Sequence, residues 1–128
     1  MTIIIGEKNM SIIDFESKQK NLTFPNVFDI SPEEVLEKKD LVVLIDVRGE
    51  DEFTGELGHI PGAQLLTLDK LPAKTNTLPK DKTIVLICRS GNRSAHAAQH
   101  LAEAGFENSF NMKGGMMEWN SKQFEVEK

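Results

Sequence analysis

Two runs of consecutive apolar residues dominate the hydropathy pattern of this chain. They are residues 41–45 (LVVLI) and residues 84–87 (IVLI). Continuous apolar runs of this length are typical of strands that are buried on both faces of a parallel sheet. Shorter apolar stretches predict further strands at residues 27–30, at residues 63–66 and within residues 106–112.

Helical patterns alternate with these strands. Ser31 is followed by Pro32 and by Glu34, which indicates a capped helix start, and this helix is expected to run to about Lys39. Shorter helical segments are predicted at residues 50–54 and 68–74, a longer helix over residues 94–104 that ends at Gly105, and a final helix after residues 114–115. Strands that alternate with helices indicate an α/β fold with a parallel sheet.

The most informative segment joins the second apolar run to the long helix. It reads Cys88-Arg89-Ser90-Gly91-Asn92-Arg93-Ser94 and contains the only cysteine of the chain. A strand that turns directly into a helix directs several backbone N–H groups, and the positive end of the helix dipole, toward one point. Helix N-termini and nearby arginines stabilise a thiolate. The segment therefore predicts a nucleophilic cysteine that handles an anion, although a lone cysteine after a buried strand is also compatible with simple core packing.

Composition narrows the range of functions. The chain has 128 residues, enough for a single domain, and a net charge of -5, which makes nucleic acids and anionic membranes unsuitable partners. One cysteine excludes an intramolecular disulfide, a multi-cysteine zinc site and a dithiol redox cycle within the chain. No apolar run approaches the ~20 residues that span a bilayer. The apolar run at residues 3–5 lacks the basic flank of a signal peptide, so we expect a cytoplasmic protein.

Other polar residues have both a functional and a structural interpretation. Asp46 and Arg48 follow a strand end near the expected site. Their functional interpretation is that they orient the loop or bind substrate, and their structural interpretation, which we favour, is an ion pair or a hydrogen bond to loop amides. For His59 we favour a turn-stabilising hydrogen bond over a catalytic base. His96 and His100 have the spacing of metal ligands on a helix, but no third ligand is evident, so no metal and no cofactor is predicted.

Several of these motifs occur together in one known family. Asp46-Val47-Arg48, Glu52-Phe53, residues 58–63 (GHIPGA), the Cys88 loop, Gly105-Phe106 and Gly114-Gly115 with Trp119 appear in the order and spacing of the single-domain rhodanese-like sulfurtransferases. The chain resembles this family over roughly residues 26–120. We therefore expect a rhodanese-like domain at residues 26–122, an N-terminal extension of unknown role at residues 1–25, and a C-terminal tail at residues 123–128.

The resemblance implies an α/β fold with about five strands in a mostly parallel sheet and helices on both faces. It also implies that the Cys88 thiolate takes the outer sulfur of a donor anion such as thiosulfate and passes it, as a persulfide, to a thiol or a protein cysteine. The substrate would be held by Arg89, Ser90, Gly91, Asn92 and Arg93, with Asp46, Arg48 and Ser94 in support. Arg93 is expected to tie the loop down, and exposed Arg89 to attract the donor.

Two alternatives remain open at this stage. A phosphatase or arsenate reductase on the same fold is disfavoured, because four residues separate Cys88 from Arg93, whereas the related phosphatases have five. A persulfide carrier or a regulatory binding module without activity of its own is the other alternative. The physiological donor and acceptor, the oligomeric state and the role of residues 1–25 are not determined by the sequence.

Overall fold

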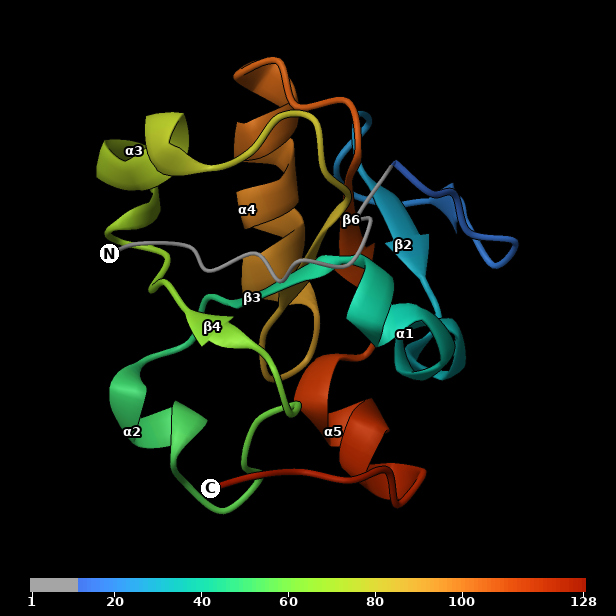
Figure 1. The fold of residues 1–128 in the computed structure, drawn as a ribbon, viewed down its shortest axis with the longest axis vertical. Coiled ribbons are helices and arrows are strands. Elements are labelled where there is room, and N and C mark those ends of the chain that lie inside the picture. The colour runs from blue at the N-terminus through green and yellow to red at the C-terminus, as the bar shows by residue number, and fades with distance from the viewer. Residues whose placement is uncertain (1–11) are drawn as a thin grey trace.

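In the computed structural model, residues 12–128 are described, and they form a sheet with helices on both faces (Figure 1). The apolar run at residues 3–5 lies outside the described residues. The strands are β1 (Gln19–Lys20), β2 (Phe28–Ile30), β3 (Val43–Asp46), β4 (Gln64–Leu65), β5 (Ile84–Ile87) and β6 (Ser109–Met112). The helices are α1 (Pro32–Lys38), α2 (Glu50–Phe53), α3 (Leu71–Lys74), α4 (Asn92–Glu103) and α5 (Gly115–Ser121), with 3-10 turns at Lys39–Leu41 and Thr75–Thr77.

The sheet has the strand order β1-β2-β6-β5-β3-β4. All neighbouring pairs are parallel except β1 and β2, which are antiparallel. The mostly parallel α/β fold predicted from the sequence is therefore confirmed. The sixth strand, β1, comes from the segment that the sequence identified only as an extension, because its exposed residues give no hydropathy signal.

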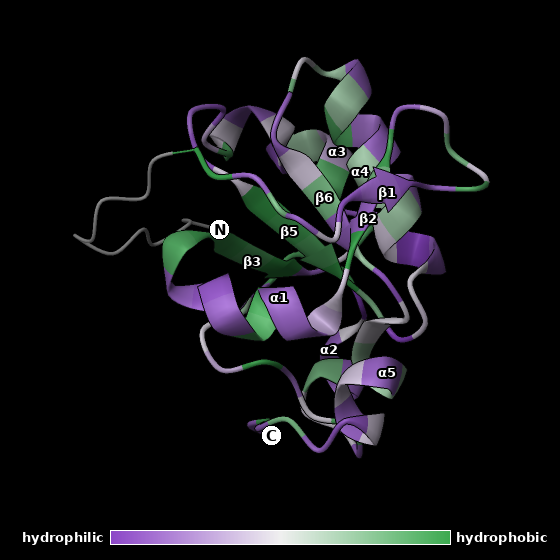
Figure 2. Cartoon of the chain, turned by 90° about the vertical axis from the view of Figure 1, so that its right-hand side faces the viewer, coloured by the Kyte–Doolittle hydropathy of each residue, from purple (hydrophilic) through white to green (hydrophobic). Residues whose placement is uncertain are grey.

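Alternate residues of the central strands enter two hydrophobic cores, one on each face of the sheet. Ile84 and Leu86 of β5 pack on the face covered by α3 and α4, and Val85 and Ile87 pack on the face covered by α1 and α5. Figure 2 shows β3 and β5 as strongly hydrophobic ribbons, among helices that contain both polar and apolar residues. Burial on both faces explains why the two sequence runs are continuously apolar rather than alternating.

The helices begin and end close to their predicted positions. Ser31 caps α1, since its side chain accepts a hydrogen bond from the Glu34 amide. Helix α4 begins at Asn92, two residues earlier than the predicted start. Its Ala97, Ala98 and Leu101 side chains are buried against the sheet, as their spacing predicts. Trp119 of α5 is fully buried.

The carboxylate of Glu34 anchors the N-terminal segment to α1. It accepts hydrogen bonds from the backbone N–H groups of Glu16 and Ser17, from the Ser17 hydroxyl and from Lys38. Burial opposes ionisation of this carboxyl group, but the hydrogen bonds outweigh it and lower the pKa of Glu34 to about 2. Together with buried Phe15, this anchor attaches residues 13–20 to the domain.

We predict that Glu34→Gln lowers the free energy of unfolding at neutral pH by about 2 kcal/mol, because the substituted amide cannot accept all four bonds. The pKa of Glu34 is lower in the folded state than its ordinary value of 4.5, so its stabilisation is complete above that pH and is lost as the pH falls toward 2. The difference in the free energy of unfolding between wild type and Glu34→Gln, measured by urea unfolding, should therefore narrow as the pH falls from 4.5 toward 2. Glu37→Gln, at an exposed position of the same helix, is the control; an equal effect of both substitutions would contradict the prediction.

Candidate active site

Cys88 follows the last residue of β5 and lies at the base of the loop that leads into α4. Its side chain is buried, and its Sγ accepts hydrogen bonds from the Gly91 amide (3.1 Å), the Ser94 amide (3.3 Å) and the Ser94 hydroxyl (3.2 Å). Three donors and the N-terminus of a twelve-residue helix therefore meet at one sulfur atom. This environment stabilises negative charge on the sulfur.

Gly91 gives the loop its shape. Its φ of 101° lies in the left-handed region, and a Cβ at this position would stand 3.2 Å from the backbone nitrogen of Gly114. Only glycine combines this conformation with so close a neighbour. The tight turn directs the Gly91 amide back toward Cys88 Sγ.

The N-terminus of α5 supports the loop from its other side. The Met116 amide donates to the Cys88 carbonyl (2.8 Å), and the Met117 amide donates to the Arg89 carbonyl (2.9 Å). Gly115 has a φ of 59°, and a Cβ there would collide with both of these carbonyl oxygens. Gly115, the first residue of α5, is thus required by the close approach of two backbones. Met116 is buried, and Met117 is exposed beside the loop.

Arg93, in the first turn of α4, binds Glu52 of α2. Its two terminal nitrogens donate to the two carboxylate oxygens at 2.8 and 2.9 Å. The Arg93 guanidinium lowers the pKa of Glu52 to about 2, and the hydrogen-bonded Glu52 carboxylate raises the pKa of Arg93. The pair ties α2 to the start of α4, at the end of the molecule where α2 and α5 flank α4 (Figure 1).

The remaining loop residues form the rim of the site. Arg89, Ser90 and Asn92 are exposed. Arg89 also borders a cavity of about 250 Å³ whose other lining residues are Arg48, Asp51, Glu52, Gly55, Glu56 and Leu57. The rim therefore combines an exposed guanidinium with the acidic residues of α2 and its following turn.

Asp46 and Arg48 lie at the end of β3 and pair with each other. Both are buried, and the guanidinium donates to both carboxylate oxygens, at 2.9 and 2.8 Å, and to the Gly58 carbonyl at 2.7 Å. The pair thus fastens the turn around Gly58 to the sheet. Arg48 also reaches the wall of the cavity beside Arg89.

The histidines form other contacts. His59 Nδ1 lies 2.8 Å from the Phe53 carbonyl oxygen, and its ring stacks on Phe53. His96 stacks on Phe24, and His100 Nε2 lies 2.9 Å from the Thr75 hydroxyl. Within residues 12–128, no cluster of three or more His, Cys, Asp or Glu side chains is arranged to hold a metal ion.

Three residues at the site were assigned no role from the sequence. Glu52 pairs with Arg93, Asn111 of β6 contacts the Ser94 hydroxyl, and Asp29 of β2 binds Asn111. The available signal for the last two was a polar residue flanked by apolar residues in each of two short strands, Phe28–Ile30 and Ser109–Met112. Their contacts depend on which strands are neighbours in the sheet and in which register they pair.

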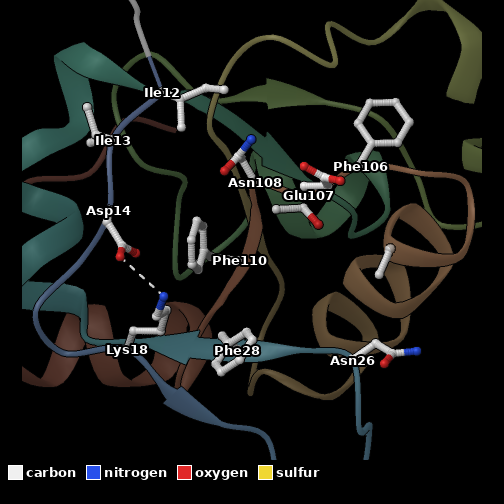
Figure 3. Close-up of a pocket in the computed structure, with 12 residues that line it drawn as sticks. Ile12, Ile13, Asp14, Lys18, Asn26, Phe28, Phe106, Glu107, Asn108 and Phe110 are labelled. Atoms are coloured by element: carbon white, nitrogen blue, oxygen red, sulfur yellow. Dashed lines mark hydrogen bonds and ion pairs between the residues drawn. The ribbon is translucent and has the colours of Figure 1, made fainter.

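A separate cavity of about 570 Å³ lies between the N-terminal segment and the start of β6 (Figure 3). Ile12, Lys18, Phe28, Phe106 and Phe110 are among its lining residues, and no residue of the cysteine loop contributes to it.

In the part of the chain that the structure describes, no helix has the length and apolar character needed to cross a membrane.

Comparison with known proteins gives one consistent result. The family model described as a rhodanese-like domain matches residues 31–122. The chain is 45% identical to a putative sulfurtransferase, YtwF, of Bacillus subtilis over 89 residues, which cover 70% of this chain and 84% of the relative. It is 34% identical to the thiosulfate sulfurtransferase GlpE of Pseudoalteromonas translucida over 88 residues, 69% of this chain and 81% of that protein.

A solved structure agrees with these relatives. The crystal structure of a rhodanese-related protein from Thermoplasma volcanium has a TM-score of 0.72 and 28% sequence identity. The similarity covers 77% of this chain and 96% of that one.

We predict that Gly115→Ala destabilises the protein by at least ~2 kcal/mol, because the added methyl group meets two backbone carbonyl oxygens in a strained conformation. The Met116 and Met117 amides should also exchange faster with solvent. Gly62→Ala is the matched control, since Gly62 also has a positive φ but a Cβ there meets nothing within 4 Å. Urea unfolding and amide hydrogen exchange provide the test; equal losses in the two variants would show that backbone strain alone is responsible.

Proposed function

This chain belongs to the rhodanese-like domain family, and we propose on that basis that it is a sulfurtransferase that carries a sulfane sulfur atom as a persulfide on Cys88. The observation that supports this most directly is the environment of Cys88 Sγ. It is a buried sulfur at a helix N-terminus that accepts from two backbone amides and lies within hydrogen-bonding distance of the Ser94 hydroxyl. Such an environment suits a thiolate that must exist without a metal or a second cysteine.

In the first half-reaction, the Cys88 thiolate attacks the outer sulfur of a donor anion such as thiosulfate. The new S–S bond forms with an electron pair from Sγ, while the donor's S–S bond breaks and its electron pair leaves with sulfite. Exposed Arg89 provides positive charge at the rim to attract the donor. Arg93 adds positive potential, although its bidentate contact with Glu52 directs its guanidinium toward α2.

In the second half-reaction, a thiolate of the acceptor attacks the outer sulfur of the persulfide. The Cys88–sulfur bond breaks, and its electron pair returns to Sγ as a thiolate. The loop amides are well suited to stabilise the outer sulfur, which carries the negative charge of the persulfide. We propose a small thiol or a protein cysteine as the acceptor, and the cytoplasm, where thiols stay reduced, as the location.

The size of the loop favours sulfur over phosphate. Four residues separate Cys88 from Arg93, one fewer than in the related phosphatases. The Gly91 and Ser94 amides lie within 3.3 Å of Sγ, so the loop closes tightly around this atom. A tetrahedral phosphoryl group needs a wider ring of donors.

Intact mass spectrometry after incubation with thiosulfate tests the proposed intermediate. Wild-type protein should gain the mass of one sulfur atom and lose it again upon addition of cyanide or a thiol reductant. Cys88→Ser should gain nothing and keep its fold by circular dichroism, because the substitution replaces one buried small side chain with another. The chain has no other cysteine, so the adduct has a single possible site.

The outcomes separate the alternative functions. A stable adduct with no turnover in the presence of small thiols would favour a carrier that needs a protein acceptor. Absence of any adduct, together with hydrolysis of a small aryl phosphate, would support a phosphatase instead. Sulfur transfer retained in Cys88→Ser would refute the proposed mechanism.

Insertion of one glycine between Asn92 and Arg93 should reduce the kcat/KM for thiosulfate at least ~100-fold, because it displaces the Ser94 amide and hydroxyl from Cys88. Steady-state sulfur transfer to cyanide measures the effect. A glycine inserted between Lys80 and Asp81, in the turn before β5, should leave kcat/KM near the wild-type value. Unchanged kinetics in the loop variant would show that the size of the loop does not govern activity.

A further inference from the structure

The Ser94 hydroxyl lies between two hydrogen-bond acceptors. Its Oγ is 3.2 Å from Cys88 Sγ and is also within hydrogen-bonding distance of Asn111 Oδ1. Cys88, Ser94 and Asn111 are all buried. A serine hydroxyl has one hydrogen, so it can donate to only one of these two acceptors at a time.

Asp29 fixes the orientation of the Asn111 amide group. Asn111 Nδ2 donates to Asp29 Oδ1 at 2.8 Å, and the same carboxylate oxygen accepts from Asn21 Nδ2 at 3.0 Å. Because a carboxylate only accepts, the NH₂ group of Asn111 must face Asp29. The carbonyl oxygen of Asn111 therefore faces Ser94 and competes with the sulfur for the hydroxyl hydrogen.

The sheet register brings these residues together. Asp29 of β2 is paired with Asn111 of β6, and Asn111 is paired with Leu86 of β5, two residues before Cys88. Directly paired residues of neighbouring strands share one face of the sheet. Helix α4 packs on that face and presents Ser94 to both Asn111 and Cys88.

Two hydrogen-bond arrangements follow from this geometry. When Sγ carries no charge, the hydroxyl donates to Asn111, and the Ser94 oxygen is free to accept from the Cys88 thiol. When Sγ is negatively charged, the hydroxyl turns to the sulfur, because hydrogen bonds to charged acceptors are the stronger ones. The Asn111 carbonyl then loses its Ser94 partner in a buried position, which costs free energy.

We propose that Asn111, held by Asp29, is a positioning residue that competes with Cys88 for the Ser94 hydroxyl and so couples the direction of this hydrogen bond to the charge on Sγ. The inference rests on the proposed function. In that reaction, Sγ is negative before it attacks the donor, uncharged in the persulfide, and negative again when the acceptor displaces it. The hydroxyl thus stabilises Sγ as a thiolate and as a leaving group, and returns to Asn111 in the persulfide.

Charged groups around the loop also act on Cys88, and the test must leave them unchanged. They are Arg93 of α4 with its partner Glu52, the buried pair Asp46 and Arg48 at the end of β3, Arg89 of the loop and Asp29 of β2. Substitutions at Asn111 and Ser94 add or remove no charged side chain, but Asn111→Leu also takes a hydrogen bond from Asp29, so its effect must be compared with and without the Ser94 hydroxyl.

The decisive measurement is the rate of Cys88 alkylation by iodoacetamide between about pH 5 and about pH 9, because only the thiolate reacts. Asn111→Leu is similar in size and removes the competing acceptor. Its alkylation profile should move to lower pH, with a rate roughly fivefold above wild type at the acid end. Ser94→Ala removes a donor to the sulfur, so its profile should move to higher pH.

The double variant separates competition from structural damage. With Ser94→Ala in place, Asn111→Leu should have no further effect on the profile, because no hydroxyl remains to compete for. Ser94→Thr restores a hydroxyl and should restore the response to Asn111→Leu. Asn108→Leu, at the other end of the β6 region, is the matched control and should behave as wild type.

The proposal is overturned if Asn111→Leu leaves the profile unchanged, moves it to higher pH, or moves it equally with and without the Ser94 hydroxyl. If Asn111→Leu does not fold, the S–H stretching band in the Raman spectrum provides a second test, since the chain has one cysteine. In acid, the S–H stretching frequency of wild type should be low, because the thiol donates a hydrogen bond to Ser94. In Ser94→Ala this frequency should be higher, because the thiol has lost that acceptor. Equal frequencies would overturn the proposal.

Alkylation and Raman measurements require no sulfur transfer. A protein that forms no persulfide but shows the expected alkylation profiles would contradict the proposed function and leave the hydrogen-bond competition intact. A protein that transfers sulfur but whose alkylation profile does not respond to Asn111→Leu would support the proposed function and overturn the hydrogen-bond competition.

Discussion

The environment of Cys88 depends on the contact between two backbones, those of the cysteine loop and of the first turn of α5. Met116 and Met117 donate to the carbonyl oxygens of Cys88 and Arg89, and this approach is possible only because residue 115 has no side chain. With its carbonyl groups held from outside, the loop directs its amides inward to the sulfur. Gly115, which follows Cys88 by more than twenty residues, thus supports the loop that surrounds the Cys88 sulfur.

Charge at the site is arranged in pairs rather than as a uniform positive surface. Asp46 neutralises Arg48, Glu52 binds Arg93, and Arg89 extends from the rim. In a chain with a net charge of -5, the groups that face Cys88 Sγ are therefore mainly backbone amides and a helix N-terminus, which favour negative charge on the sulfur. In the proposed reaction, fixed dipoles of this kind need no reorganisation when the charge moves between Sγ and the outer sulfur.

The segment before residue 26 is integrated with the domain through several contacts, two of which involve the buried carboxylates of Glu34 and Asp29. Glu34 holds the backbone of residues 16 and 17, and Asp29 accepts a hydrogen bond from Asn21 as well as from Asn111. The second contact belongs to the polar chain that reaches Ser94 and Cys88. A hairpin that lies outside the family match at residues 31–122 is therefore connected through hydrogen bonds to Cys88.

The sequence by itself determined the α/β fold, the positions of the two central strands and of α1 and α4, and the location of Cys88 at the end of a strand. These features depend on local patterns: continuous apolar runs, a serine cap and a cysteine between a strand and a helix. Only the tertiary structure decided that β1 joins the sheet, that Glu52 binds Arg93, and that Asp29 and Asn111 lie behind Ser94. Strand β1 consists of two exposed residues without a hydropathy signal, and the other contacts join residues distant in sequence. These distant contacts depend on strand order and register, which the hydropathy of a single strand does not encode.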